Sequence, residues 1–185
     1  MTQMDKDIEK VLFSEEEIRQ NIERLGAEIS RDYEGKNLLL ICILKGSLVM
    51  TADLMKNITI PCRLDTIVAS SYDKNHSTGA IKVSKDLDHD MLSDFDVLLV
   101  EDIIDSGFTL NHLKDHLAQR SPRSLKILTL LDKPSGRAEG ITLKPDYTGM
   151  VFSGGFVVGY GLDYDQYYRN LPYIGILKES VYSGK

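Results

Sequence analysis

The sequence lacks most features that would place it outside the ordinary soluble globular proteins. It has only two cysteines, Cys42 and Cys62, without CxxC spacing or a nearby set of histidines. We therefore expect two reduced thiols rather than a disulfide framework or a zinc site. The longest apolar run, residues 38–44, is far too short to span a bilayer. The charged first residues lack the apolar stretch of a signal peptide, so we expect a cytoplasmic protein without membrane contact.

An excess of positive charge is also missing. The chain carries 22 basic and 28 acidic residues, a net charge of −6, which argues against a general nucleic-acid binder. The best basic stretch holds only Arg120, Arg123 and Lys126. Any polyphosphate ligand therefore needs local lysine or arginine, or a divalent cation. Without an internal repeat, linker or low-complexity tract, residues 1–185 are expected to form a single domain with a good core.

Two familiar phosphate-binding loops, GxxxxGK[ST] and a GxGxxG that opens a helix, are absent. Residues 97–109, VLLVEDIIDSGFT, stand out instead. Four apolar residues indicate a strand buried on both faces, and a helix is predicted from Thr109. Glu101, Asp102 and Asp105 thus fall where a strand ends and a helix begins, the place where open α/β sheets bind ligands. Amides at a helix start attract phosphate, whereas carboxylates beside them repel it. A site with both therefore suits a ligand that carries a phosphate and hydroxyls, such as a sugar phosphate, bound together with a metal.

Helical and strand patterns alternate over the first two-thirds of the chain. Ser14 and Glu17 have capping-box spacing at the start of a helix over 15–31. The alternation predicts an α/β fold, an open twisted and mainly parallel sheet flanked by helices. The last third, rich in short strands and glycine, predicts a small hood built from the N-terminal and C-terminal segments. The remaining expectations are strands at 38–44, 66–69, 96–100, 126–131, 149–152, 156–158 and 174–177, helices over 48–56 (Leu48, Ala52 and Met55 on one face) and 109–119, and a mobile polar loop over 70–80.

Residues 97–109 closely resemble the signature of the type I phosphoribosyltransferases, whose loop binds 5-phosphoribosyl-1-pyrophosphate. The resemblance implies that Glu101 and Asp102 face the ribose hydroxyls and the Mg²⁺ bound there. It also implies that the 5′-phosphate is held at the helix start by amides and hydroxyls. The residues it assigns to that phosphate are Asp105, Ser106, Gly107, Phe108 and Thr109.

Further segments between residues 44 and 171 follow the family's order. Lys45 and Gly46 resemble the pyrophosphate loop, which in this family holds a non-proline cis peptide. Arg169 resembles the arginine that binds pyrophosphate. Ser71 and Tyr72 match the Ser-Tyr pair at the tip of a lid in the six-oxopurine branch of the family.

The purine site is implied by the same resemblance. Lys133 stands where the family has a lysine that donates to the purine O6 atom. Phe156 would stack on the base, and the backbone of Val157 would hydrogen-bond the base edge. Asp163 would lie near the base and join Glu101 and Asp102 around the metal.

The implied activity is transfer of a 5-phosphoribosyl group to N9 of hypoxanthine or guanine in purine salvage, by a homodimer or homotetramer. Asp105 would act on the N7 proton as the general base. Taken singly, the remaining residues have plainer readings, namely a turn for Lys45, a solvated side chain for Lys133, core packing for Phe156 and a surface salt bridge for Arg169. Two other classes remain open: a regulator that binds nucleic acid, and a receiver domain phosphorylated at Asp102 or Asp105.

Overall fold

The computed structural model describes residues 3–71, 81–88 and 91–183. Several helices and strands are longer in the structure than the sequence predicted. Tyr72 and the rest of the predicted loop lie outside the described residues, whereas residues 70–71 end a strand rather than begin a loop. The elements are η1 Gln3–Asp7, β1 Ile8–Phe13, α1 Glu15–Asp32, β2 Leu38–Leu44, α2 Leu48–Asn57, β3 Cys62–Ser71, β4 Ile81–Lys85, β5 Asp96–Ile104, α3 Phe108–Ala118, β6 Ser124–Asp132, η2 Pro134–Gly136, β7 Tyr147–Val151, β8 Val157–Val158, β9 Ile174–Leu177 and α4 Glu179–Tyr182.

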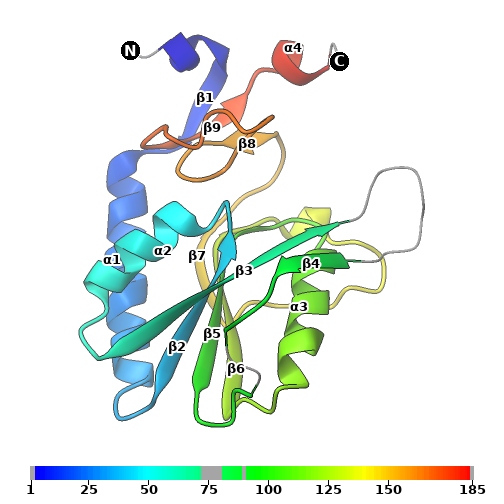
Figure 1. Cartoon of the computed structure of the whole chain (residues 1–185). Helices are drawn as coiled ribbons and strands as arrows, with labels where there is room; N and C mark the ends of the chain where they lie inside the picture. Colours follow the sequence, from blue (N-terminus) through cyan, green and yellow to red (C-terminus); the bar gives the residue numbers. More distant parts are fainter. Residues whose placement is uncertain (1–2, 72–80, 89–90, 184–185) are drawn as a thin grey trace.

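The main sheet has six strands in the order β4-β3-β2-β5-β6-β7. All neighbours are parallel except β4, which pairs antiparallel with β3. The second sheet, which we call the hood, joins β1, β9 and β8 in antiparallel order. Figure 1 shows the hood standing over one end of the main sheet, with both chain termini beside it. The predicted fold class, an α/β fold with a mainly parallel sheet and a small hood, is confirmed.

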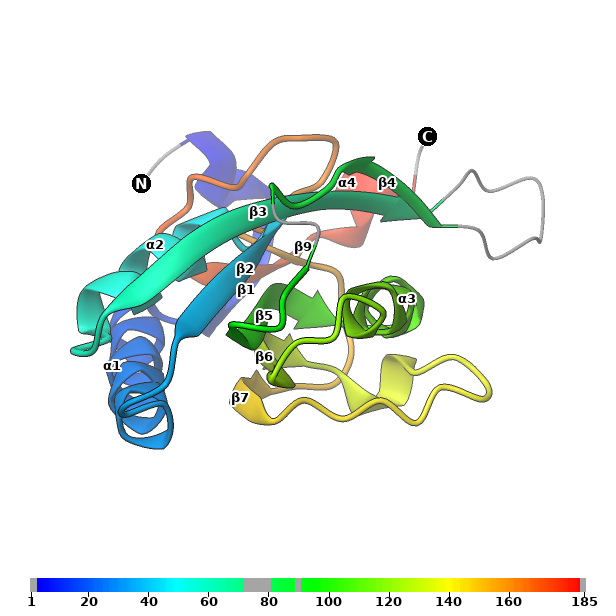
Figure 2. The ribbon, with the colours of Figure 1, turned by 60° about the horizontal axis from the view of Figure 1, so that its bottom comes forward.

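Helices cover both faces of the main sheet, so its central strands are apolar on both sides. Along β2, Leu38 and Leu40 pack with α1 and α2, whereas Leu39, Ile41 and Ile43 pack with α3. Figure 2 shows α1 and α2 on one side of the strands and α3 on the other. This alternation explains the continuous apolar run, because each successive side chain enters a different core layer. Among the described residues, no helix is long and apolar enough to cross a membrane.

Several predicted details differ from the structure. The buried face of α2 carries Met50, Thr51 and Leu54, whereas Leu48 is exposed, so the predicted face was wrong. The strand expected at 149–152 belongs to the main sheet as β7, parallel to β6, and not to the hood. Strands β1 and β4 were not predicted at all.

Candidate active site

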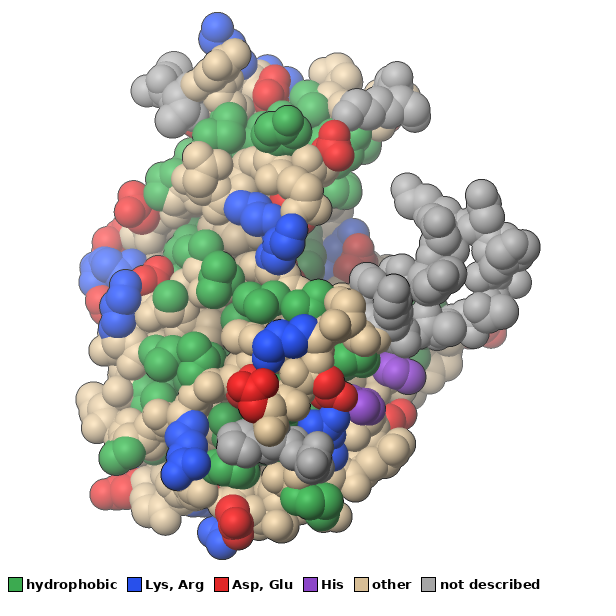
Figure 3. All heavy atoms as spheres, viewed as in Figure 1, with side chains coloured by type: hydrophobic (Ala, Val, Ile, Leu, Met, Phe, Trp, Pro, Cys, Tyr) green, Lys and Arg blue, Asp and Glu red, His purple; other side chains and the backbone are tan. Residues whose placement is uncertain are grey.

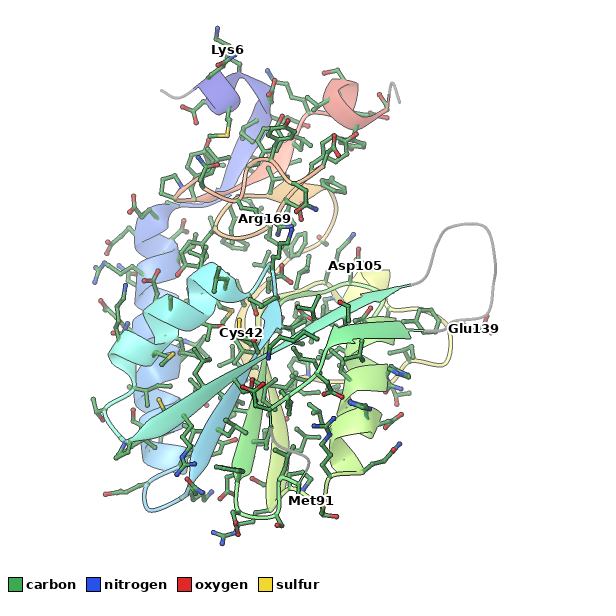
Figure 4. All side chains as sticks on the ribbon, in the orientation of Figure 1. Lys6, Cys42, Met91, Asp105, Glu139 and Arg169 are labelled. Carbon is green, nitrogen blue, oxygen red and sulfur yellow. The ribbon has the colours of Figure 1, made fainter. Side chains whose placement is uncertain are left out.

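Glu101 and Asp102 lie within the last four residues of β5, not after it, because the strand continues to Ile104. Both line a pocket of about 310 Å³ at the carboxyl end of the main sheet. Asp105, Ser106, Gly107 and Thr109 line the same pocket from the following turn and helix start. The structure therefore brings the predicted acids and the predicted phosphate turn to one cavity. In Figure 4 the labelled Asp105 and Arg169 both lie at the end of the sheet that faces the hood, and Figure 3 shows the molecule narrowing at this level.

The adjacent carboxyl groups of Glu101 and Asp102 are withdrawn from solvent. Burial, together with the charge of Asp102, raises the pKa of Glu101 well above its usual range. Burial also raises the pKa of Asp102, although the nearby charge of Arg169 acts in the opposite direction. Two adjacent carboxylates that are withdrawn from water repel each other, and a cation bound between or beside them stabilises their ionised form.

The turn before α3 presents backbone amides to this pocket. Gly107 is the N-cap of α3 and has φ of 80°, a left-handed conformation that glycine adopts without steric cost. The first N–H groups of a helix have no partner within it, so the amides from Phe108 onward are available to an anion. Phe108 itself is the first residue of α3, one residue earlier than predicted, and its side chain is exposed.

Lys45 and Gly46 follow β2, the strand next to β5, and line the same pocket. The Leu44–Lys45 peptide bond is cis, as in the loop that these residues resemble. The absence of a side chain at Gly46 has a visible reason: a Cβ there would lie 1.6 Å from Oδ2 of Asp102. Lys45 Nζ donates to Oε1 of Gln166 at 3.1 Å.

Arg169 reaches the pocket from the loop after β8 and is held by several contacts. Its Nη2 pairs with Oδ1 of Asp163 at 2.7 Å, and its Nη1 donates to the carbonyl of Gly161 at 2.7 Å. A Cβ at Gly161 would lie 2.1 Å from the Gly46 carbonyl, so this loop packs closely against the Lys45 loop. Asp163 lines the pocket as well, and the pair forms one wall with a positive and a negative member.

Lys133 follows β6, and its Nζ lies 3.2 Å from Oδ2 of Asp105. Lys133 is not part of the pocket lining, but this ion pair places it at the pocket's rim. The predicted purine donor and the predicted general base are thus direct neighbours.

Phe156 and Val157 lie in the hood and do not line the pocket. The Phe156 ring, 39% exposed, meets Tyr164 edge-on at 5.7 Å and lies 5.4 Å from the ring of Tyr182 in α4. Phe156 thus packs against two tyrosine rings and is still partly exposed. Of the predicted lid, only the backbone of Ser71 is described, and Tyr72 lies outside the described residues.

Across the described residues, no three His, Cys, Asp or Glu side chains gather as a ready-made metal site. Asp163 lines the same pocket as Glu101 and Asp102 but is engaged by Arg169 and by the amide of Gln166. The predicted metal set therefore shares one cavity without forming a closed cluster.

Two residues near the site had no signal in the sequence. Arg137 donates to the carbonyls of Ile104 and Asp105 at 2.7 and 2.9 Å, and Gln166 contacts both Lys45 and Arg169. Arg137 contacts Ile104 and Asp105, 33 and 32 residues away, and Gln166 contacts Lys45, 121 residues away. Periodicity and spacing cannot reveal such contacts.

Comparison with known proteins agrees with this geometry. The family model described as "Phosphoribosyl transferase domain" matches residues 11–165. The chain is 49% identical over 180 residues to the hypoxanthine-guanine phosphoribosyltransferase of Bacillus subtilis, covering 97% of this chain and 98% of that protein. It is 48% identical over 181 residues to the bifunctional protein TilS/HprT of Listeria innocua, again over 97% of this chain, but spans only 28% of that protein. A hypoxanthine phosphoribosyltransferase structure from Staphylococcus aureus superposes with a TM-score of 0.92 at 43% identity, covering 98% and 97% of the two chains.

Proposed function

The chain belongs to the phosphoribosyl transferase domain family, and we propose that it transfers the 5-phosphoribosyl group of phosphoribosyl pyrophosphate to N9 of hypoxanthine or guanine. The products are inosine or guanosine monophosphate and pyrophosphate, as in purine salvage. One observation carries the proposal: a single pocket of about 310 Å³ joins the buried Glu101, the half-buried Asp102, a helix start and the cations Lys45 and Arg169. Full-length similarity to a hypoxanthine-guanine phosphoribosyltransferase supports the choice of substrates.

The sugar phosphate and the leaving group are bound by different segments of the pocket lining in this proposal. The turn of Asp105, Ser106, Gly107, Phe108 and Thr109 binds the 5′-phosphate through helix-start amides and hydroxyls. Lys45, the Gly46 amide and Arg169 bind the pyrophosphate and stabilise the negative charge that grows on it as the C1–O bond breaks.

Magnesium fits the acids Glu101 and Asp102, the second of which lies against Gly46. Hard carboxylate oxygens are its preferred protein ligands, and it is usually held by one or two of them together with phosphate oxygens of the substrate. Glu101 and Asp102 supply two adjacent carboxylates whose pKa values are raised by burial, so a dication relieves an existing electrostatic cost. We assign Glu101 and Asp102, with Asp163 nearby, to this role. Bound there, the ion would neutralise charge on the pyrophosphate oxygens.

Proton transfer is assigned to Asp105 because a purine must lose a proton when N9 becomes bonded to ribose. Its carboxylate lies 3.2 Å from Nζ of Lys133, and O6 and N7 lie on the same edge of a purine. Lys133 donates to O6 while Asp105 accepts from N7, so the pair reads one base edge. A donor-only lysine suits a 6-oxo group and matches the 6-amino group of adenine poorly.

The hood contacts the purine base in this scheme. Phe156, which is partly exposed, stacks on the purine, and the backbone of Val157 hydrogen-bonds the base edge. Ser71 and Tyr72 belong to a lid that excludes water from the developing oxocarbenium carbon.

We extend the proposal to the state of the protein. Residues 1–185 act as one domain, since β1 pairs with β9 across the chain. Two free cysteines, one of them buried, suit a reducing, cytoplasmic location. We also propose a homodimer or homotetramer, as the resemblance to the family implies.

The regulator that binds nucleic acid gains no support. Arg120 pairs with Asp86, Arg123 lies 4.0 Å from Asp94, and Lys126 stands over the rings of Tyr33 and Tyr147. On the face drawn in Figure 3, Lys and Arg are interspersed with Asp and Glu. The cations of the predicted basic stretch are therefore engaged within the protein.

The test is direct. The protein is incubated with phosphoribosyl pyrophosphate, Mg²⁺ and hypoxanthine, guanine or adenine, and nucleotide formation is followed by chromatography. We expect inosine and guanosine monophosphates and little adenosine monophosphate. No product from either 6-oxopurine contradicts the proposal.

A further inference from the structure

We propose that Arg137 is a positioning residue that holds the purine-reading pair Lys133 and Asp105 in register with the phosphate turn; this rests on the proposed function. Arg137 touches neither pocket nor substrate in that scheme, because it does not line the cavity. Its effect is exerted through the backbone that carries the two reacting side chains.

The guanidinium of Arg137 connects the ends of two neighbouring strands. Nη1 donates to the carbonyls of Ile104, Asp105 and Lys133 at 2.7, 2.9 and 3.3 Å. Nη2 pairs with the carboxylate of Asp132, and both side chains are about 15% exposed. One planar cation thus satisfies three carbonyls and one acid where the pairing of β5 with β6 ends.

Two neighbouring backbone bonds continue this connection beyond the strands. The amide of Lys133 donates to the carbonyl of Ile104 at 3.0 Å, and the amide of Ala138 donates to the carbonyl of Ser106 at 3.1 Å. The side chain of Arg137 adds its bonds to the carbonyls of Ile104 and Asp105 between these two. The segment from Lys133 to Ala138 is therefore hydrogen-bonded to residues 104–106 through its first residue and its last two.

The side-chain space around Arg137 is equally restricted. A Cβ at Gly136 would lie 1.6 Å from Oδ1 of Asp105, so the Asp105 carboxylate rests directly on the glycine next to Arg137. A Cβ at Gly107 would lie 3.5 Å from Cδ of Arg137. The arginine stem and its neighbouring glycine thus limit both the proton acceptor and the turn that binds phosphate.

The geometric consequence concerns the purine edge. Asp105 follows β5 and Lys133 follows β6. Their 3.2 Å separation therefore depends on the contacts that hold the two chain segments together beyond the last strand pair, Ile104 and Asp132. Removing Arg137 takes away the one donor that the carbonyls of Ile104, Asp105 and Lys133 share. The backbone amides of Lys133 and Gly136 still bond to the carbonyls of Ile104 and Lys133, but the two loops lose their side-chain link and are freer to separate. A displacement of about 1 Å costs roughly 10²-fold in rate when a reacting geometry is lost.

The test compares Arg137→Met and Arg137→Lys with the matched control Arg24→Met in steady-state kinetics. Arg24 also donates to two backbone carbonyls, those of Thr148 and Gly149, away from the pocket. For Arg137→Met we expect kcat to fall roughly 10²-fold and KM for hypoxanthine to rise, while KM for phosphoribosyl pyrophosphate stays within about threefold. Arg137→Lys keeps the positive charge but not the several N–H donors of the guanidinium, so its kcat should lie between those of wild type and Arg137→Met. Arg24→Met should resemble wild type.

A second measurement separates positioning from stability. In an Asp105→Ala background, Arg137→Met should reduce kcat by less than about threefold, because its main route of action is already removed. Full additivity in that background, or wild-type kinetics for both Arg137 variants, overturns the inference. If Arg137→Met does not fold, Arg137→Lys decides by the same criteria. An inactive wild-type protein would instead refute the proposed function, which distinguishes the two failures.

Discussion

Gly46 and Asp102 are in such close contact that a single added methyl group would overlap the carboxylate: a Cβ at Gly46 would lie 1.6 Å from Oδ2 of Asp102. The backbone that we assign to pyrophosphate therefore rests against an acid that we assign to magnesium. The two halves of the substrate site are in direct contact, and a change in one displaces the other.

Gly46→Ala should raise KM for phosphoribosyl pyrophosphate by at least tenfold, because either Asp102 or the loop must move away. Gly35→Ala is the control: Gly35 has φ of 72° and no atom near its Cβ position, so it should lose about 1–2 kcal/mol of stability without a change in KM. Initial-rate kinetics and urea unfolding measure the two effects. An unaltered KM for Gly46→Ala would show that the contact is not needed.

Lys133→Met should weaken hypoxanthine recognition specifically. A hydrogen bond to a charged group contributes about 1.5–3 kcal/mol, so kcat/KM for hypoxanthine should fall roughly 10- to 150-fold. The constants for phosphoribosyl pyrophosphate should change little. Equal losses for both substrates would instead assign Lys133 to the general architecture of the pocket.

Asp105→Ala should retain binding of phosphoribosyl pyrophosphate, measured by calorimetry, but lower turnover by roughly 10²–10⁴-fold, the range of a general acid–base group. Because Asp105 is half exposed, the substitution should leave the unfolding midpoint close to that of wild type. Unchanged turnover would remove Asp105 from the proton-transfer role.

The Asp86 carboxylate fastens the segment after β4 to α3 and should make stability depend on pH. Burial raises its pKa, but the Leu87 amide, His116 and Arg120 outweigh burial and lower that pKa overall. A lowered pKa in the folded state contributes stability above the unfolded value of about 3.9, and this contribution is lost as pH falls through the folded pKa.

Asp86→Asn should therefore lower the melting temperature most at pH 6–7, with the difference from wild type shrinking below about pH 4. The effect should be modest, about 0.5–1 kcal/mol, since the side chain is 38% exposed. Asp88→Asn, 83% exposed, is the control. A difference that stays constant from pH 3 to 7 would contradict the role of this charge.

The predictable parts of the fold were those whose signals are local. β2 was predicted to the residue because its apolar run is continuous and enters two cores, and α1 was found from a capping box that the structure contains in full. The α2 face was wrong because apolar residues surround this short helix, so only contact with its neighbours decides which of them are buried. β1 was missed because its partner, β9, lies over 160 residues away.

The candidate site divides along the same line. The acids and the phosphate turn lie within nine residues, so one segment predicts them, and the resemblance supplied Lys45 and Arg169. The Lys45–Gln166 contact and the contacts of Arg137 with the carbonyls of Ile104 and Asp105 arise only when separate segments meet. Such contacts leave no periodic trace in the sequence.

The pairing of β1 with β9 also sets an order of events during synthesis on the ribosome. The strands of the main sheet are complete once residue 151 has been translated, whereas β1 has no strand partner until residues 174–177 emerge. The turn assigned to the 5′-phosphate and the Lys133–Asp105 pair are therefore translated first. The hood, which carries Val157, is assembled only when the newest residues pair with the oldest.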